Sequence, residues 1–142
     1  MKRESLQLLG LARKAGKLEI GEEPVGAVTR AKRGRLVLIA SDAGDHTFRR
    51  VKSFTAGTKQ PWIRLDCTKD EFGDAIGYSA VAIAAITDIR LALAFAKTLE
   101  PADKYAELLS DLEERAARAE QRQKEEKAHK LNVKKHKTKS KN

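Results

Sequence analysis

The sequence predicts an α/β fold, a three-layer helix–sheet–helix sandwich around a central mixed sheet of about four strands. Segments with the apolar spacing of helices alternate with short apolar runs through the first hundred residues, the pattern of such sandwiches. The two longest apolar runs, "LVLIA" and "AVAIAAI", are almost continuous, as in strands covered on both faces. A chain of 142 residues fits one domain, or one domain and a tail.

The first three elements are predicted as helix, strand and helix. Residues 5–15 place apolar side chains at helical spacing, and Gly16 is a helix stop. Residues 17–20 alternate like a short strand, which Gly21 breaks. Residues 22–33 again have helical spacing. Acidic residues open this helix and basic residues close it, which suits its dipole.

The middle of the chain predicts strand, helix and strand. Residues 36–41 form the first continuous apolar run. Residues 45–56 are predicted as a short helix that ends at Gly57, and Asp45 is expected to cap it rather than to serve a phosphate or metal loop. Residues 61–66, "PWIRLD", alternate like a third strand.

The last core elements carry clear helix-start signals. Thr68 and Glu71 have the spacing of a capping box, which predicts a helix to about residue 76. The run "SAVAIAAITD" is the fourth predicted strand, and Asp88 is placed to cap a final helix over residues 89–99.

The chain is predicted to divide near Pro101, with a domain over 1–100 and a charged extension over 101–142. Residues 102–130 have the composition of a charged helix. Their apolar stripe, Leu108, Leu109 and Leu112, is expected to dock on the core. Residues 130–142 contain six lysines and no acidic residue, so we expect a disordered basic tail.

Composition favours a polyanionic partner and gives little support for an enzyme. The chain has 29 Lys and Arg against 20 Asp and Glu, a net charge of +9. No stretch reaches transmembrane length and no signal-peptide pattern is seen, so we expect a cytoplasmic location and no membrane partner. Cys67 is interpreted as a small residue at a strand end. The scattered histidines provide neither catalytic nor metal-ligand spacing, so we expect no catalytic residue, cofactor or metal.

The turn at Gly21 is the strongest local indication of a binding site. It connects a strand to a helix, whose N-terminus offers free N–H groups, and glycine permits close approach. An ordinary turn is the alternative, but it does not explain the basic residues nearby. These are Arg13, Lys14 and Lys17 before the turn and a group that begins at Arg30 after it.

Four segments, "LLGLARKAGKLEIGEEPVGAV", "GRLVLIASDA", "TKDEFGDAIG" and "AVAIAAITD", resemble in order those of the kink-turn-binding ribosomal protein family. This family includes archaeal L-seven-Ae, eukaryotic L-thirty-e and small bacterial ribosomal-protein-like relatives, and the resemblance, over about residues 5–98, is closest to the bacterial ones. It implies the same sandwich and a non-catalytic RNA-binding role.

The family resemblance also implies where RNA binds. In kink-turn binders the turn after the first strand reads Gly-x-Asn-Glu-x-x-Lys. Gly21 matches the glycine here, whereas Glu23, Pro24 and Ala27 replace the other three. The second RNA-facing loop of the family corresponds to residues 77–80. Tyr78 is placed to stack on a base, with a half-buried strand-edge tyrosine as the alternative. The predicted RNA-binding residues are Arg13, Lys14, Lys17, Gly21, Glu22, Glu23, Arg30, Gly77, Tyr78 and Ser79.

These observations together predict a non-catalytic, ribosomal or ribosome-associated protein that binds structured RNA, ribosomal RNA first among the candidates. We expect a monomer, with contacts to ribosomal proteins. The alternative is a protein-interaction module of the same fold, because three of the four signature residues are replaced and the charged helix offers a contact surface.

Overall fold

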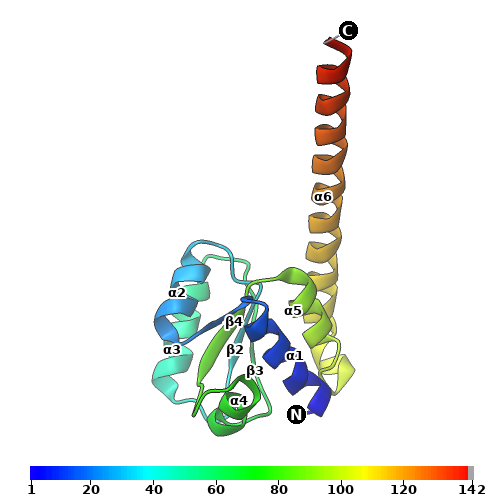
Figure 1. The fold of residues 1–142 in the computed structure, drawn as a ribbon. Helices are drawn as coiled ribbons and strands as arrows, with labels where there is room; N and C mark the ends of the chain where they lie inside the picture. Colours follow the sequence, from blue (N-terminus) through cyan, green and yellow to red (C-terminus); the bar gives the residue numbers. More distant parts are fainter. Residues whose placement is uncertain (141–142) are drawn as a thin grey trace.

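The computed structural model describes the backbone of residues 1–140 and the side chains of residues 1–134. It shows a four-stranded sheet between two helical layers, with one long helix that projects from the domain (Figure 1). The elements are, in order, α1 (Arg3–Lys14), β1 (Leu18–Ile20), α2 (Glu22–Arg30), β2 (Leu36–Ile39), α3 (Asp45–Thr55), β3 (Trp62–Arg64), α4 (Lys69–Ile76), β4 (Ile83–Ile86), α5 (Ile89–Ala96), the 3₁₀ turn η1 (Ala102–Tyr105) and α6 (Ala106–Ser140).

The sheet is mixed, as predicted, with the strand order β1-β4-β2-β3. β4 runs antiparallel to both of its neighbours, β1 and β2, whereas β2 and β3 are parallel. The two central strands are buried along their whole length. Their continuous apolar sequences follow from this position, because helices cover both faces of the sheet.

Each face of the sheet has its own apolar core. Helices α2 and α3 cover one face, and the other carries α1, α4, α5 and the start of α6 (Figure 1). The first core contains Val25, Val28, Val37, Ile39, Val51, Ile83 and Ala85. The larger second core includes Leu9, Leu36, Leu38, Phe72, Phe95, Tyr105 and Leu112. The predicted sandwich is confirmed.

Both strong helix-start predictions are confirmed. The Thr68 hydroxyl accepts a hydrogen bond from the Glu71 amide at 3.2 Å, and the Glu71 carboxylate accepts one from the Thr68 amide at 3.1 Å. These bonds to Thr68 hold the pKa of the Glu71 carboxyl below its ordinary value. At α5, Asp88 Oδ1 accepts hydrogen bonds from the amides of Arg90 and Leu91.

The prediction that Asp45 caps α3 is wrong. Gly44 is the N-cap residue, no side chain of the described residues caps this helix, and Asp45 lies in its first turn. Asp42 makes a contact of this kind at another helix, α4, where its Oδ1 accepts a hydrogen bond from the Lys69 amide at 2.8 Å. A carboxylate near the end of β2 therefore contacts the start of α4, because parallel β2 and β3 end at the same edge of the sheet.

The extension begins as part of the core and ends as a free helix. Tyr105 and Leu112 are buried, and Leu108 and Leu109 pack partly against them, as the apolar stripe predicted. The helix continues beyond residue 130 to Ser140, and the expected disorder of the basic tail without an anionic partner stays a prediction. Lysine has good helix propensity, and neither Gly nor Pro interrupts this stretch. Residues 141–142 lie outside the described residues.

Among the described residues, no helix combines the length and apolar character needed to cross a membrane.

Candidate nucleic-acid interface

The turn at Gly21 has a backbone conformation that favours glycine. Gly21 has φ 100° and ψ 162°, and it is the N-cap residue of α2. Its amide donates a hydrogen bond to the Ile83 carbonyl at 3.0 Å, which places the turn beside the start of β4. A Cβ built on Gly21 would meet only Pro24 Cδ, at 3.7 Å, among the described residues. The positive φ, rather than a lack of space, therefore selects glycine.

The first turn of α2 presents a single unpaired carboxylate. No side chain within the described part of the chain caps this helix. The Glu22 carboxylate lies 2.9 Å from Arg50 Nε as an ion pair, without the alignment of a hydrogen bond, and accepts a long hydrogen bond from Thr47. Glu23, Pro24 and Ala27 are exposed. The three positions where the family signature is replaced thus lie on the solvent side of the helix.

The second predicted loop begins where α4 ends. Gly77 is the C-cap residue in the left-handed conformation, with φ 80°. Tyr78 is 44% exposed, and the Arg13 guanidinium carbon lies 5.0 Å from the centre of its ring. A Cβ on Gly77 would lie 2.8 Å from Arg13 Nη1. The flexible Arg13 side chain could move away from such an atom, so the positive φ is what favours glycine at 77. Arg13 and Tyr78 form an exposed cation–aromatic pair.

The loop after Tyr78 packs tightly against α4 and carries Ser79 on its exposed side. A Cβ on Gly73 would lie 2.7 Å from the Tyr78 carbonyl oxygen and 2.9 Å from the Ala80 amide nitrogen. Because real Cβ atoms do not come so close to backbone atoms, glycine at 73 is what allows the loop to cross α4. Ser79 is exposed, so its hydroxyl faces solvent.

Direct contacts join only some of the predicted residues, and the loop after Gly77 leads to Ile83, whose carbonyl accepts the Gly21 hydrogen bond. Gly21, Glu22 and Glu23 form one group at the start of α2. Arg13, Gly77, Tyr78 and Ser79 form a second around the end of α4, and exposed Lys14 is the last residue of α1. Lys17 lies at the opposite end of β1 from Gly21, where its carbonyl accepts a hydrogen bond from Thr87. Arg30 is the last residue of α2, a helix of nine residues.

The sequence does not predict the arginine–aromatic contacts between α2 and α3. The Arg30 and Arg50 guanidinium carbons lie 5.9 and 5.1 Å from the centre of the Phe54 ring. Arg64 lies 4.0 Å from the centre of the Phe48 ring. The Arg30–Phe54 and Arg64–Phe48 pairs join different elements, so residue spacing carries no signal for them, whereas Arg50 and Phe54 are four residues apart on α3. Arg30 is thereby held on the α2–α3 surface, away from the Gly21 turn.

The described residues offer little for covalent or metal chemistry. They contain no group of three or more His, Cys, Asp or Glu side chains that could hold a metal ion. Cys67 is buried after β3, and burial raises the pKa of its thiol to about 11. This thiol is therefore protonated at neutral pH, and its interpretation as a small structural residue is consistent with its surroundings.

No protein-family model matches the chain. The chain is 34% identical over 85 residues to the RNA-binding protein YlxQ of Bacillus subtilis, covering 60% of this chain and 84% of that protein. It is 34% identical over 64 residues to the RNA-binding protein YlxQ of Enterococcus faecium, where the match covers 45% of this chain and 62% of the relative, less than two thirds of its length.

Two solved structures share the fold. A protein of unknown function from Bacillus halodurans superposes with a TM-score of 0.59 at 28% identity, over 66% of this chain and 98% of that one. The 15.5kD RNA binding protein of Giardia lamblia superposes with a TM-score of 0.54 at 20% identity, over 66% of this chain and 80% of that one, a likeness of fold alone. Because the Bacillus subtilis relative is matched over most of its length, this chain belongs to the family of the RNA-binding protein YlxQ.

Proposed function

We propose that this protein is a non-catalytic RNA-binding protein whose partner is a structured RNA. The observation that carries the proposal is the 34% identity to the RNA-binding protein YlxQ of Bacillus subtilis over 84% of that protein. The exposed pair of Arg13 and Tyr78 and the net charge of +9 support it. Both are features that proteins use to hold unpaired bases and phosphates.

The start of α2 is better suited to a base than to a phosphate. An uncapped helix N-terminus ordinarily attracts anions. Here the Glu22 charge is paired with Arg50, but the exposed Glu23 carboxylate remains and repels a phosphate. A carboxylate instead accepts hydrogen bonds from the N1–H and N2–H₂ groups of guanine. We therefore assign base recognition to the Gly21 turn and phosphate contact to arginines and lysines elsewhere.

Tyr78 supplies the stacking surface in this proposal. Its ring is 44% exposed, and the guanidinium of Arg13 lies on it. A base that stacks on the free part of the ring would lie close to a positive charge, which suits the phosphate that accompanies it. Lys14, exposed at the end of α1, adds to the positive potential at this end of the helix.

We expect this protein to bind a kink-turn RNA only weakly. Pro24 and Ala27 stand where the family has a glutamate and a lysine, and neither has a polar side chain. We propose that the natural RNA is ribosomal and that the protein is cytoplasmic. The alternative is a protein-interaction module, which the replaced signature and the exposed residues 120–134 of α6 favour.

The test measures binding of a labelled kink-turn RNA by fluorescence anisotropy, and co-sedimentation with ribosomes at increasing KCl. We expect salt-sensitive co-sedimentation and weak kink-turn binding by the natural sequence. The variant Glu23→Asn/Pro24→Glu/Ala27→Lys restores the family signature and should bind the kink-turn more tightly by at least tenfold. Thermal melts of both proteins control for folding.

Two results would contradict parts of this proposal. Tight kink-turn binding by the natural sequence that depends on the G·A pairs would show that the replaced residues matter little. No binding to ribosomes or to RNA by either folded protein at low salt would favour the protein-interaction module.

A further inference from the structure

We propose that a cleft between α6 and the starts of β2 and β3 is a second RNA-contacting site, which holds phosphates of the RNA backbone. This α6 cleft has a volume of about 510 Å³ and is lined by five cationic side chains. They are Arg35, Lys59, Arg115, Arg118 and Arg122. Pockets of this size accommodate small organic ligands, so there is room for on the order of one nucleotide. The inference rests on the proposed RNA-binding function and adds a site to it.

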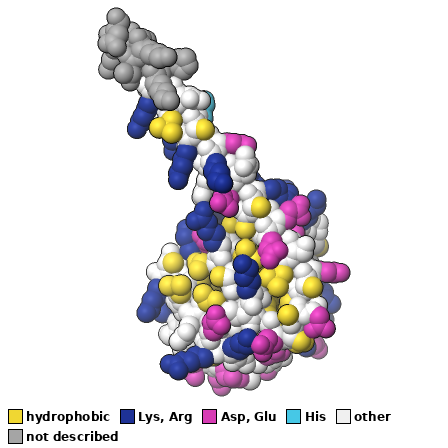
Figure 2. All heavy atoms as spheres, turned by 90° about the vertical axis from the view of Figure 1, so that its right-hand side faces the viewer, with side chains coloured by type: hydrophobic (Ala, Val, Ile, Leu, Met, Phe, Trp, Pro, Cys, Tyr) yellow, Lys and Arg dark blue, Asp and Glu magenta, His cyan; other side chains and the backbone are white. Residues whose placement is uncertain are grey.

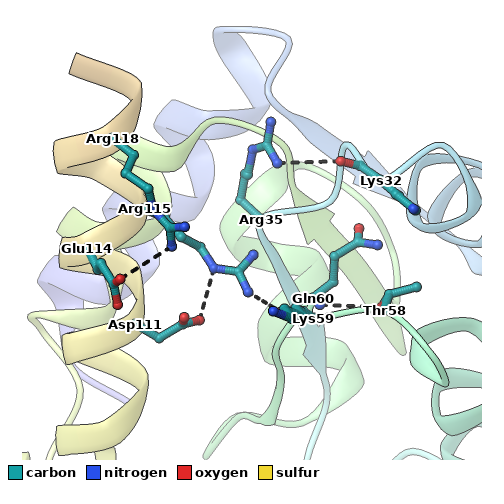
Figure 3. A network of polar contacts seen from close by, with 9 residues as sticks. All are labelled: Lys32, Arg35, Thr58, Lys59, Gln60, Asp111, Glu114, Arg115 and Arg118. Atoms are coloured by element: carbon teal, nitrogen blue, oxygen red, sulfur yellow. Dashed lines mark hydrogen bonds and ion pairs between the residues drawn. The ribbon is translucent and has the colours of Figure 1, made fainter. Parts of the chain in front are cut away.

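The cations come from three parts of the chain that the fold brings together. Arg35 lies just before β2, and Lys59 lies before β3 (Figure 3). Arg115, Arg118 and Arg122 are three and four residues apart on α6. At 3.6 residues per turn, their side chains leave the helix within about 60° of one another. One stripe of α6 therefore faces the cleft with three guanidinium groups.

Arg115 holds α6, one wall of the cleft, against the segment before β3. Its side chain is only 20% exposed, its Nε lies 3.1 Å from Asp111, and its Nη2 donates a hydrogen bond to the Lys59 carbonyl (Figure 3). Further along α6, Arg90 donates a hydrogen bond to Gln123 at 3.0 Å. These contacts hold α6 against the domain, so the cleft exists before a ligand arrives, and preorganisation of this kind lowers the cost of binding.

Three of the five cationic side chains in the cleft form no ion pair with a carboxylate of the described residues. Asp111 and Glu114 are the acidic residues that line the cleft, and they pair with Arg115 and Arg118. The Arg118–Glu114 pair is long, 3.7 Å, and 59% of the Arg118 side chain is exposed. Within the described part of the chain, no carboxylate pairs with Arg35, Lys59 or Arg122.

An RNA backbone fits this charge and shape better than an apolar ligand does. Guanidinium groups bind phosphate oxygens with paired hydrogen bonds, and most of the exposed lining is polar. A second cleft lined by Lys32, Arg35, Lys59 and Arg115 adjoins the first through shared residues and lengthens the basic track. Figure 2 shows dark-blue Lys and Arg side chains where α6 leaves the domain, with acidic ones among them.

The α6 cleft is distinct from the Gly21 turn. Gly21 is hydrogen-bonded to Ile83 at the start of β4, whereas Arg35 is hydrogen-bonded to Ile86 at its end. Three residues of strand separate these two bonds, roughly 10 Å along the sheet. An RNA that reaches both sites must pass from one end of the sheet to the other. The α6 cleft should therefore contribute affinity and salt dependence rather than choice of sequence.

The test compares two variants of the full chain that remove the same charge. The cleft variant, Arg35→Gln/Lys59→Gln/Arg122→Gln, neutralises the three cleft side chains that pair with no carboxylate and keeps Arg115. Arg3→Gln/Lys97→Gln/Lys104→Gln removes three exposed cations that do not line the cleft. Binding of a fluorescein-labelled 16-base-pair RNA duplex is followed by anisotropy between 50 and 200 mM KCl, with urea unfolding of each protein as the folding control.

We expect the cleft variant to lose at least tenfold in affinity at 100 mM KCl. Its slope of log K against log salt should fall by about 2 to 3, since each lost phosphate contact removes roughly one. The control variant should change the slope by less than 1. Equal effects of the two variants would overturn the cleft while leaving RNA binding intact. No binding by the wild-type chain to this duplex, to the kink-turn RNA or to ribosomes would overturn both proposals.

A further arm uses poly-L-glutamate as the probe for an acidic protein partner. If the cleft variant loses poly-L-glutamate binding but keeps wild-type affinity for the RNA duplex, the cleft serves an acidic polypeptide and the inference is wrong.

Discussion

At the scale of single residues, the sequence predicted the positions of Gly21, Gly77 and Tyr78 in turns and loops, but not the contacts that they make. Gly21 and Gly77 stand out in the sequence because each follows a predicted element, and both adopt positive φ in the structure. Tyr78 left two interpretations open, a stacking residue or a half-buried edge residue. It lies in a loop, 44% exposed and in contact with Arg13, and its stacking on a base stays a prediction. The contact itself was not predictable, because it joins α1 to a loop 65 residues later.

Tyr78→Ala should weaken RNA binding by roughly 1–3 kcal/mol, about 5- to 150-fold, because stacking of a base on an aromatic ring contributes that much. Tyr78→Phe keeps the ring and should bind within about twofold of the wild type. Anisotropy titrations with the RNA that binds best provide the measurement. If the alanine and phenylalanine variants lose the same affinity, the hydroxyl rather than the ring is important, and the stacking interpretation fails.

At the scale of elements, the existence and type of each helix and strand followed from the sequence, but their ends and partners did not. Apolar spacing and capping residues are local signals, so they can be recognised in the sequence alone. The helix predicted over residues 22–33 ends at Arg30, and Lys32 then adopts φ 58° in the turn that leads to β2. Asp42 rather than Asp45 caps a helix, because the partner helix comes from another part of the chain.

The capping box of α4 makes a prediction about stability and pH. Thr68→Ala should lower the free energy of unfolding by about 1 kcal/mol at pH 7, since it removes the N-cap hydroxyl. The pKa of Glu71 is lowered in the folded protein by its bonds to Thr68. Its contribution to stability is therefore complete above the unfolded pKa and is lost as pH falls through the folded value.

Urea unfolding of the wild type and Thr68→Ala at pH 7 and at pH 3 measures both effects. The difference in stability between the two proteins should shrink at the lower pH, where protonation of Glu71 weakens the reciprocal bond to the Thr68 amide. Thr58→Ala, which removes a hydroxyl bonded to the Thr55 carbonyl, is the matched control. A difference that is unchanged by pH would show that Glu71 takes no part in the cap.

At the scale of the whole molecule, the sequence predicted the sandwich but not which cations share a surface. Lys17 and Gly21 are neighbours in the sequence yet lie at opposite ends of β1. The α6 cleft combines three separate segments, and its only local signal is the stripe of arginines at 115, 118 and 122. Of the basic residues before β2, Arg35 lines this cleft together with the α6 arginines (Figure 3).

The division of the chain into a domain and an extension gives the last prediction. Leu112 is the last buried apolar residue in the described part of the chain, so residues 1–112 contain both cores. A protein ending at residue 112 should unfold cooperatively in urea, with a loss of roughly 1–2 kcal/mol from the missing Arg115 contacts.

Two further truncations locate the boundary between the folded domain and the extension. A chain ending at residue 118 keeps the Arg115 contacts but loses the Arg90–Gln123 hydrogen bond, so its stability should lie within about 1 kcal/mol of the full chain's. A chain ending at residue 104 lacks Tyr105 and Leu112, both buried in the larger core, and should lose roughly 4 kcal/mol or more, because each large apolar side chain removed from a core costs about 2–5 kcal/mol. If the chain ending at residue 112 unfolds without a cooperative transition, the second half of α6 is part of the folding unit, and the boundary lies further along the helix.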